Sequence, residues 1–134
     1  MSMPLYLLDT DVSINYLRGS AGIIRRVQTI GSTNLCISEI TVAELKYGAA
    51  KSNRPEYHQR QVDSFCAKFE IVPIFQALDI FAFEKTRLEK IGQRLDDFDL
   101  LIGVTAIRYR LVLATNNVKH FERIQHLTVE NWTA

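Results

Sequence analysis

Short apolar runs alternate along the chain with longer segments in which apolar residues return every three or four positions. A short apolar run is typical of a buried strand, whereas the longer period marks one face of a helix. Pro73 falls inside one run and indicates an edge strand or an irregular segment there. The runs predict strands at residues 5–8, 35–37, 71–75, 111–115 and 127–129, and the periodic segments predict helices at residues 12–17, 23–30, 40–50, 55–69, 77–91 and 98–110.

Strands that alternate with helices favour an α/β fold, with a mainly parallel sheet covered by helices on both faces. The 134 residues contain no repeat, no low-complexity stretch and no internal linker, so we expect a single domain over residues 1–134. A hydrophobic content of 47% is enough for a core of its own. In such sheets ligands bind beyond the carboxyl ends of the strands, which makes the residues after each strand the ones to inspect.

The composition excludes several classes of protein. No apolar stretch approaches the ~18 residues that span a bilayer, and the first residues lack the pattern of a secretion signal. Cys36 and Cys66 lie in apolar segments without a C-x-x-C motif, which favours buried, reduced thiols. We therefore expect a cytoplasmic protein without a membrane partner. The formal net charge of +1 hides a more basic surface if the acids gather at one site.

Carboxylates from three distant segments stand where they can meet at one edge of this sheet. An acidic pair follows the first strand, a glutamate lies about one turn into the helix after the second, and an acidic cluster opens the helix at residue 98. A threonine and two asparagines follow the fourth strand. These residues are Asp9 and Asp11; Glu44; Asp96, Asp97 and Asp99; and Thr115, Asn116 and Asn117.

Each acid taken alone also fits a helix cap, since Asp is a common N-cap residue and Glu44 lies at capping-box distance from Thr41. A cap contributes about 1 kcal/mol, whereas two like charges about 4 Å apart cost about 4 kcal/mol at the dielectric of a protein surface. No Lys or Arg stands at a strand end to neutralise the group, and a divalent cation would do so. Ligands that are all oxygen favour Mg²⁺ or Mn²⁺.

The first acidic pair also resembles the D-x-D motif of the haloacid-dehalogenase phosphatases. Under that interpretation Asp9 is a nucleophile that accepts a phosphoryl group, and Asp11 is the acid and base. That family needs a Lys and an acidic pair after a late strand, whereas Asn116 and Asn117 follow the late strand here. The phosphatase stays a less favoured alternative.

Four stretches taken together resemble one family in its order and spacing. They are LLDTDVSINYL, CISEITVAELKYGA, LDDFDLLIGVTA and LVLATNNVKHFERI, and the likeness continues to the closing VENW. The chain is similar to the PIN-domain ribonuclease toxins of the VapC type, which belong to bacterial toxin–antitoxin pairs. The resemblance implies a PIN-like three-layer α/β/α sandwich with a central, mainly parallel sheet of about five strands.

The resemblance also carries the family's site residues onto this chain. Asp9, Asp99 and Glu44 fall on the acids that would hold the metal, and the other matched residues support them. The family's fourth acid falls on Asn117, a departure that puts a full second metal site in doubt. Asp11 either replaces the missing charge or caps a helix. The residues at the catalytic positions are Asp9, Glu44, Asp99, Asp97, Asn117, Thr115 and Thr10.

The function implied is a Mg²⁺-dependent endoribonuclease, with Mn²⁺ able to substitute, that cleaves structured RNA with a metal-activated water. For this family the substrate is a tRNA anticodon loop or a ribosomal RNA loop, and initiator tRNA is our first expectation. The implied partners are a VapB-type antitoxin that occupies the active site, a second copy of the chain, and operator DNA reached through the antitoxin. A non-catalytic PIN-like domain that binds RNA or a partner without cutting stays the second alternative.

A nuclease also needs groups that hold RNA beside its acids. Tyr16 and Tyr47 are candidates for base stacking, His120 is expected at the surface, and Gly103 costs its helix about 1 kcal/mol without a visible benefit. The apolar helical stretches at residues 14–17 and 62–69 are expected to exceed the needs of one core, which favours a homodimer. The candidate cations are Arg18, Arg25, Arg26, Lys46, Lys51, Arg54, Lys85, Arg87, Lys90, Arg94 and Lys119.

Overall fold

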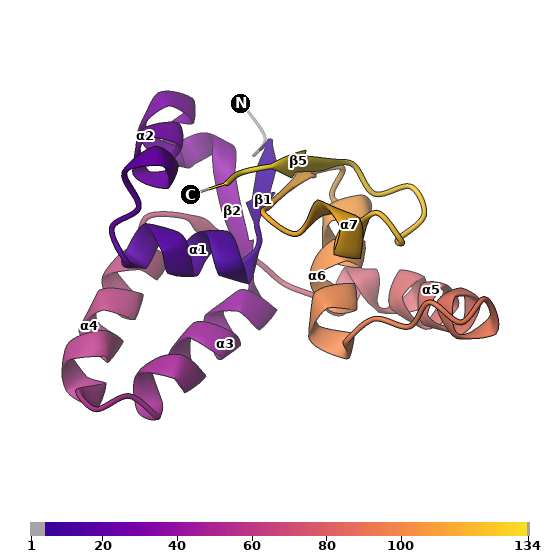
Figure 1. Ribbon diagram of the computed structural model, residues 1–134, viewed down its shortest axis with the longest axis horizontal. Coiled ribbons are helices and arrows are strands. Elements are labelled where there is room, and N and C mark those ends of the chain that lie inside the picture. Colours follow the sequence, from indigo (N-terminus) through magenta and orange to yellow (C-terminus); the bar gives the residue numbers. More distant parts are fainter. Residues whose placement is uncertain (1–4, 134) are drawn as a thin grey trace.

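A five-stranded parallel sheet forms the centre of the computed structural model, which describes residues 5–133 (Figure 1). The strand order is β3-β2-β1-β4-β5, so β1 is central and β3 and β5 are the edges. Every pair is parallel, and the carboxyl ends of all five strands therefore face the same way. The strands are β1 (Tyr6–Leu8), β2 (Leu35–Ser38), β3 (Glu70–Val72), β4 (Val112–Thr115) and β5 (Val129–Asn131).

Helices cover both faces of this sheet. The first four α-helices share a hydrophobic cluster with one face, and the later three share a second cluster with the other. The helices are α1 (Thr10–Leu17), α2 (Ala21–Ile30), α3 (Glu39–Ala50), α4 (Pro55–Cys66), α5 (Leu78–Lys90), α6 (Asp97–Arg108) and α7 (Val118–Phe121), with short 3-10 turns η1 (Ser32–Asn34) and η2 (Phe75–Ala77).

Short strands are enough to hold the fold together, because successive side chains of a strand pack into hydrophobic clusters on opposite faces of the sheet. Leu7 enters the cluster with α5 and α6, whereas its neighbour Leu8 enters the cluster with α1 to α4. Leu113 and Ala114 divide in the same way on β4. All four side chains are fully buried, as expected for a parallel sheet that is covered on both faces.

The predicted elements are confirmed in kind, and several boundaries were wrong. The third strand ends at Val72, because Pro73 cannot continue the ladder, and Phe75, the last residue of the predicted strand, begins η2 instead. The last strand lies at Val129–Asn131 rather than at residues 127–129. Helix α7 was not predicted, since four residues are too few to display a helical period.

Gly103 has a packing reason that the sequence did not reveal. It is buried in the middle of α6, where a Cβ atom would lie 2.4 Å from Cδ1 of Ile124. Ile124 is itself buried in the cluster that covers this face of the sheet. The missing side chain therefore lets the segment after α7 approach α6 closely, which offsets the lost helix propensity.

An ion pair between the buried Glu84 and Arg87 connects α5 to the segment that follows α7. Glu84 is buried and accepts from the Arg87 guanidinium at both carboxylate oxygens, at 2.8 and 2.7 Å. The Gln125 N–H also donates to Glu84, at 2.7 Å, and Arg87 donates to the backbone carbonyl of Arg123. The Arg87 hydrogen bonds hold the pKa of Glu84 below its usual range, against the opposing effect of burial.

The apolar surplus does not lie where the sequence placed it. Val62, Phe65 and Phe69 are buried in the core, so the 62–69 stretch provides no free apolar face. The most exposed large apolar side chains are instead Phe75 and Phe83, which are 74% and 79% exposed. Among the helices of residues 5–133, none combines the length and apolar character needed to cross a bilayer.

Candidate active site

Asp9 stands directly after the central strand β1 and is only 3% exposed. Its Oδ1 accepts from the backbone N–H of Thr10 at 2.8 Å, so it is the N-cap residue of α1. Its Oδ2 accepts from the Thr115 hydroxyl at 2.8 Å, which comes from the end of β4. Capping and a place in the site are therefore compatible roles for Asp9, although they first looked like alternatives.

Glu44 reaches the site from the second turn of α3. Its Oε1 accepts from the Thr10 hydroxyl at 2.7 Å, and that hydroxyl also lies 2.9 Å from the hydroxyl of Thr41. The capping-box interpretation of Thr41 and Glu44 was wrong, because Ser38 is the N-cap residue of α3 and Thr41 is buried inside the helix. Thr10 thus connects the two acids, since its backbone N–H donates to Asp9 and its hydroxyl donates to Glu44.

Asp99 comes from the first turn of α6. Asp96 caps this helix and accepts from the N–H groups of Phe98 and Asp99. The Asp99 carboxylate is free of capping and lies 2.9 Å, through Oδ2, from Nε2 of His120. His120 belongs to α7 and was expected at the surface, so its contact with a candidate catalytic acid is a finding of the structure.

Asp97 and Asn117 are more peripheral than these three acids. Asp97 is exposed and pairs with Lys85 at 2.9 Å. Asn117 is exposed, and its backbone N–H donates to the Thr115 hydroxyl at 3.0 Å, the same hydroxyl that donates to Asp9. Asn117 therefore contributes a backbone group that orients Thr115.

Burial and neighbouring carboxylates raise the pKa values of the acids in this site. Burial raises the pKa of Asp9 to about 7, although the bonds from Thr115 and Thr10 oppose this, and Asp11 and Asp99 raise it further. Burial also raises the pKa of Glu44, and the charges of Asp99 and Asp11 are among those that add to the effect. Asp11 is exposed in the first turn of α1, and its charge, like that of Asp96, adds to the negative charge around the three predicted acids.

The pKa of Asp99 follows the same pattern. Burial raises it, the hydrogen bond and charge of His120 lower it, and Asp96 and Asp11 raise it. Of the basic side chains in residues 5–133, His120 alone is in hydrogen-bond or ion-pair contact with Asp9, Glu44 or Asp99. Three carboxylates from β1, α3 and α6 therefore share a partly dry site that is short of positive charge.

The donor set suits a hard divalent cation. All its donors are oxygens, and a cation would relieve both the burial and the mutual repulsion of the carboxylates. Among the described residues, no group of three or more Asp, Glu, His or Cys side chains is placed so that it could hold an ion as a protein-only cage. Mg²⁺ does not need one, since it keeps several waters and binds through one or two carboxylates together with substrate phosphates.

Comparison with known proteins gives a consistent set of relatives. The PIN-domain family model matches residues 6–127. Ribonuclease VapC2 of Rickettsia felis is 34% identical over 131 residues, covering 96% of this chain and 98% of that protein. The tRNA(fMet)-specific endonuclease VapC of Salmonella typhimurium is 31% identical over 128 residues, covering 95% and 97%. The structure of DNA-bound VapBC from Salmonella typhimurium matches with a TM-score of 0.93 at 32% identity, covering 98% of this chain and 100% of that chain.

The fold and the site together define the class of protein. It has a parallel sheet with helices on both faces and carboxylates at the carboxyl edge of that sheet. The chain belongs to the PIN-domain family and, within it, to the VapC ribonucleases. The resemblance found in four sequence stretches is thereby confirmed, as is the PIN-like α/β/α sandwich.

Two site residues escaped the sequence argument. His120 was considered as a contact to substrate or to Asn117 and then assigned to the surface, because its contact with Asp99 depends on α7, a helix that the sequence did not predict. Thr41 was interpreted only as a possible cap, although its hydroxyl meets that of Thr10 across the site. Both contacts join segments that are more than 20 residues apart, at separations of 21 and 31 positions.

Proposed function

We propose that the protein is a metal-dependent endoribonuclease and the toxin of a bacterial toxin–antitoxin pair. The observation that carries the proposal is the placement of Asp9, Glu44 and Asp99 at the carboxyl edge of the sheet, where burial raises the pKa of each and the charge of Asp99 adds to the effect on the other two. Such a group is costly to keep without a cation. Several relatives are named ribonucleases, including that of Rickettsia felis, which supports RNA as the substrate class.

In this proposal Asp9 and Asp99 hold Mg²⁺, and Glu44 is a direct or water-mediated ligand. The ion supplies neutralisation of the scissile phosphate and a lower pKa for the attacking water. Thr115 and the backbone of Thr10 fix both oxygens of Asp9, and the Thr10 hydroxyl fixes Glu44.

The remaining site residues have supporting roles in the proposal. His120 holds Oδ2 of Asp99 and leaves Oδ1 for a ligand. Asn117 orients Thr115 through its backbone N–H. Asp97 is a peripheral acid whose charge Lys85 already balances. Asp11 adds negative charge near all three central acids.

Cleavage of a structured RNA by the purified protein tests the proposal. We expect cleavage with Mg²⁺ or Mn²⁺, none with EDTA, and loss of cleavage in Asp9→Asn and Asp99→Asn. The matched control is Asp79→Asn, an acid in the first turn of α5, which should cleave normally. Full activity in EDTA, or in Asp9→Asn with its fold intact, would remove the metal mechanism.

We further propose initiator tRNA, cut in its anticodon loop, as the substrate. The relatives from Salmonella typhimurium and Shigella flexneri are named tRNA(fMet)-specific endonucleases, at 31% and 28% identity, and this supports the choice. Sequencing of RNA ends after expression in cells should place the cuts in that loop. Cuts confined to ribosomal RNA would contradict it.

The proposed partner is a small DNA-binding antitoxin whose tail enters the acidic site. The solved VapBC complexes of related proteins, one of them bound to promoter DNA, support this partner. Expression of the protein alone should arrest growth, and co-expression with the product of an adjacent small gene should relieve the arrest. An arrest that persists in Asp9→Asn would show that growth inhibition does not come from cleavage.

We also propose a homodimer, with the exposed Phe75 and Phe83 as the apolar surface that favours it. Light scattering of the purified protein should give twice the chain mass. A monomeric mass at micromolar concentration would contradict the dimer.

The phosphatase alternative has little support in the site. A phosphatase of that kind needs an acidic pair after its late strand, whereas Asn116 and Asn117 follow β4 here. The match to the PIN-domain family points the same way. A trapped phosphoryl group on Asp9 would restore the phosphatase interpretation.

A further inference from the structure

Seven of the eleven cations that the sequence offered for RNA binding already form an ion pair or lie over an aromatic ring. Lys85 pairs with Asp97, and Arg87 with the buried Glu84. Tyr16 is likewise unavailable for a base, because its ring packs against Phe65 in the core. The further paired or stacked cations are Arg26, Lys46, Lys51, Arg54 and Arg94.

A polar cleft lies beside α7, the helix that carries His120 and so contacts Asp99. It measures about 380 Å³ and lies between the turn after α5 and helix α7. Lys119 lines this cleft and directly precedes His120, whose ring contacts Asp99. The residues lining the cleft are Gly92, Gln93, Lys119, Glu122 and Arg123.

The charges of this cleft suit a phosphate. Arg123 donates to the backbone carbonyl of Arg94 at 3.2 Å, so its guanidinium is held in place without its charge being neutralised. Within residues 5–133, neither Arg123 nor Lys119 forms an ion pair. The cleft is therefore lined by two cations and one carboxylate, that of Glu122, so the net charge of its lining is positive.

An exposed aromatic ring lies on the other side of the centre. Tyr47 is 66% exposed and follows Glu44 by three positions on α3, so the two side chains share one face of that helix. Lys51 lies over the Tyr47 ring, 4.8 Å from its centroid. An exposed ring with a neighbouring cation is the platform on which single-stranded nucleic acids stack a base.

The topology places these two features on opposite sides of Asp9. Helix α3 follows β2 and helix α7 follows β4, and β1 lies between these strands. Figure 1 shows α3 and α6 on either side of the lower end of β1. A strand that crosses the acidic centre from one side to the other therefore passes both features.

We propose that single-stranded RNA binds across the acidic centre, with a base on one side stacked on Tyr47 and a phosphate on the other side held by Lys119 and Arg123. This inference rests on the proposed function, because it requires RNA to be the substrate. It assigns flanking nucleotides to two sites of different chemistry, one aromatic and one cationic.

Binding of a labelled single-stranded RNA of about ten nucleotides, followed by anisotropy over a range of salt concentrations, separates the two sites. The background is Asp9→Asn, which prevents cleavage during the measurement. The double substitution Lys119→Gln and Arg123→Gln should weaken binding and make the log–log salt slope about 0.7 to 1.4 shallower, since each phosphate contact contributes about 0.7 on a single strand. Tyr47→Ala should weaken binding about tenfold with the slope unchanged, and Tyr47→Phe should retain affinity.

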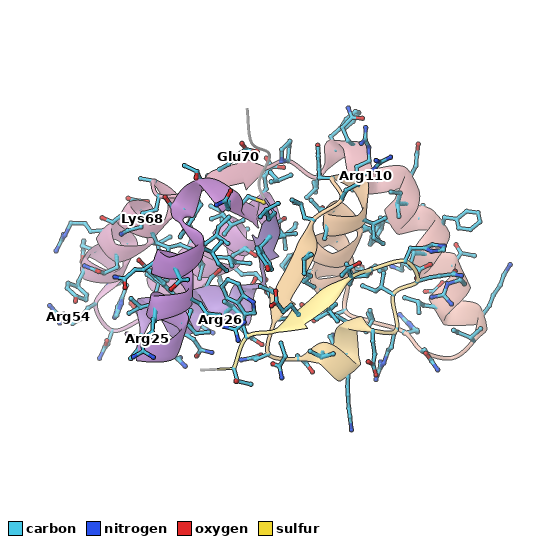
Figure 2. The ribbon with its side chains drawn as sticks, turned by 90° about the horizontal axis from the view of Figure 1, so that it is seen from above. Arg25, Arg26, Arg54, Lys68, Glu70 and Arg110 are labelled. Carbon is cyan, nitrogen blue, oxygen red and sulfur yellow. The ribbon has the colours of Figure 1, made fainter. Side chains whose placement is uncertain are left out.

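Matched control variants lie away from this path. Arg110 precedes β4 at the amino edge of the sheet, where Lys68 precedes β3 and Glu70 begins it (Figure 2), so Arg110→Gln should leave the slope unchanged. Tyr57 carries a cation, Arg54, over its ring at the start of α4, and Tyr57→Ala should bind RNA normally.

The outcomes distinguish this inference from the proposed function. If the unsubstituted protein cleaves RNA but the slope and affinity of the tested variants equal those of the controls, the two binding sites are wrong and the nuclease stands. If the unsubstituted protein neither binds nor cleaves RNA, the proposed function fails first. Circular dichroism of each variant establishes that lost affinity is not lost folding.

Discussion

At the scale of single residues, Asp9 combines a structural and a chemical task. Asp9 follows β1 and is the N-cap residue of α1, and its carboxylate accepts hydrogen bonds from Thr10 and Thr115. Burial nevertheless raises its pKa to about 7, because hydrogen bonds from neutral groups do not replace a counter-charge. The residue is thus held in place at the expense of stability as long as no cation lies beside it.

This conflict predicts how stability depends on pH without metal. The pKa of Asp9 is about 7 in the folded chain and about 3.9 in an unfolded one, so its contribution is fully present below about pH 4 and is lost as pH rises toward 7. Asp9→Asn should therefore raise the free energy of unfolding at pH 8 in EDTA, by at most about 4 kcal/mol, less about 1 kcal/mol for a lost hydrogen bond.

Urea denaturation at pH 5 and pH 8 measures this effect, with Asp63→Asn on exposed α4 as the control. Addition of Mg²⁺ at pH 8 should raise the free energy of unfolding of the unsubstituted protein and leave that of Asp9→Asn unchanged. Equal pH profiles for the two proteins in EDTA would contradict the role of Asp9.

His120 is the second residue whose effect can be predicted. Because its ring holds Oδ2 of Asp99, its removal should leave the fold intact and loosen a metal ligand. We expect His120→Ala to lower Mg²⁺ affinity or cleavage about 10- to 100-fold, as for other groups that orient metal ligands. Titration of cleavage against Mg²⁺ gives the measurement, and His58→Ala on α4 is the control. An unchanged titration would show that the contact with Asp99 is incidental.

At the scale of elements, α6 matters most, because it carries Asp99 at its start and packs closely at its centre. Gly103 allows Ile124 to approach, and this fixes the segment that follows α7. Helix α7 in turn presents His120 to Asp99. A glycine that weakens the helix locally therefore helps to position two elements of the site.

A double-mutant cycle tests this packing. Gly103→Ala should destabilise the chain, because its Cβ would meet Cδ1 of Ile124 at 2.4 Å. Ile124→Val removes that atom, so the cost of Gly103→Ala should fall by about 1 kcal/mol in its presence. Urea denaturation of the four proteins gives the coupling. Additivity within about 0.3 kcal/mol would mean that Ile124 moves aside freely.

At the scale of the whole molecule, the site joins segments from both halves of the chain. Asp9 and Glu44 come with the first helical layer, whereas Asp99 and His120 come with the second. The Glu84–Arg87 pair connects α5 to the segment after α7 and so holds the second layer together far from the chemistry.

Removal of that pair should loosen one region before the rest. Glu84→Ala leaves Arg87 and the Gln125 N–H without their partner, and we expect a loss of about 1–3 kcal/mol. Hydrogen exchange should speed up first in the segment after α7, while β1 and β2 stay protected. Uniform acceleration over all strands would show that the pair supports the whole fold.

Local patterns determined much of this protein. Apolar runs and helical periods gave the number and order of the five strands and the six longer helices, because each of these elements buries a face that its own residues define. They also put Asp9, Glu44 and Asp99 at helix starts near one edge, since parallel strands share a carboxyl edge whatever their order. The residues just after the strands were therefore the right ones to inspect.

Only the tertiary structure decided which groups touch. The contact of His120 with Asp99, the use of Thr115 on Asp9 and the closeness of Ile124 to Gly103 join distant segments, and no local period encodes them. The pairing of cations was equally invisible, because an ion pair depends on the distance between two side chains and not on their types. The strand order and the packing of the helices set those distances, and they also raise the pKa of Asp9 by burying it.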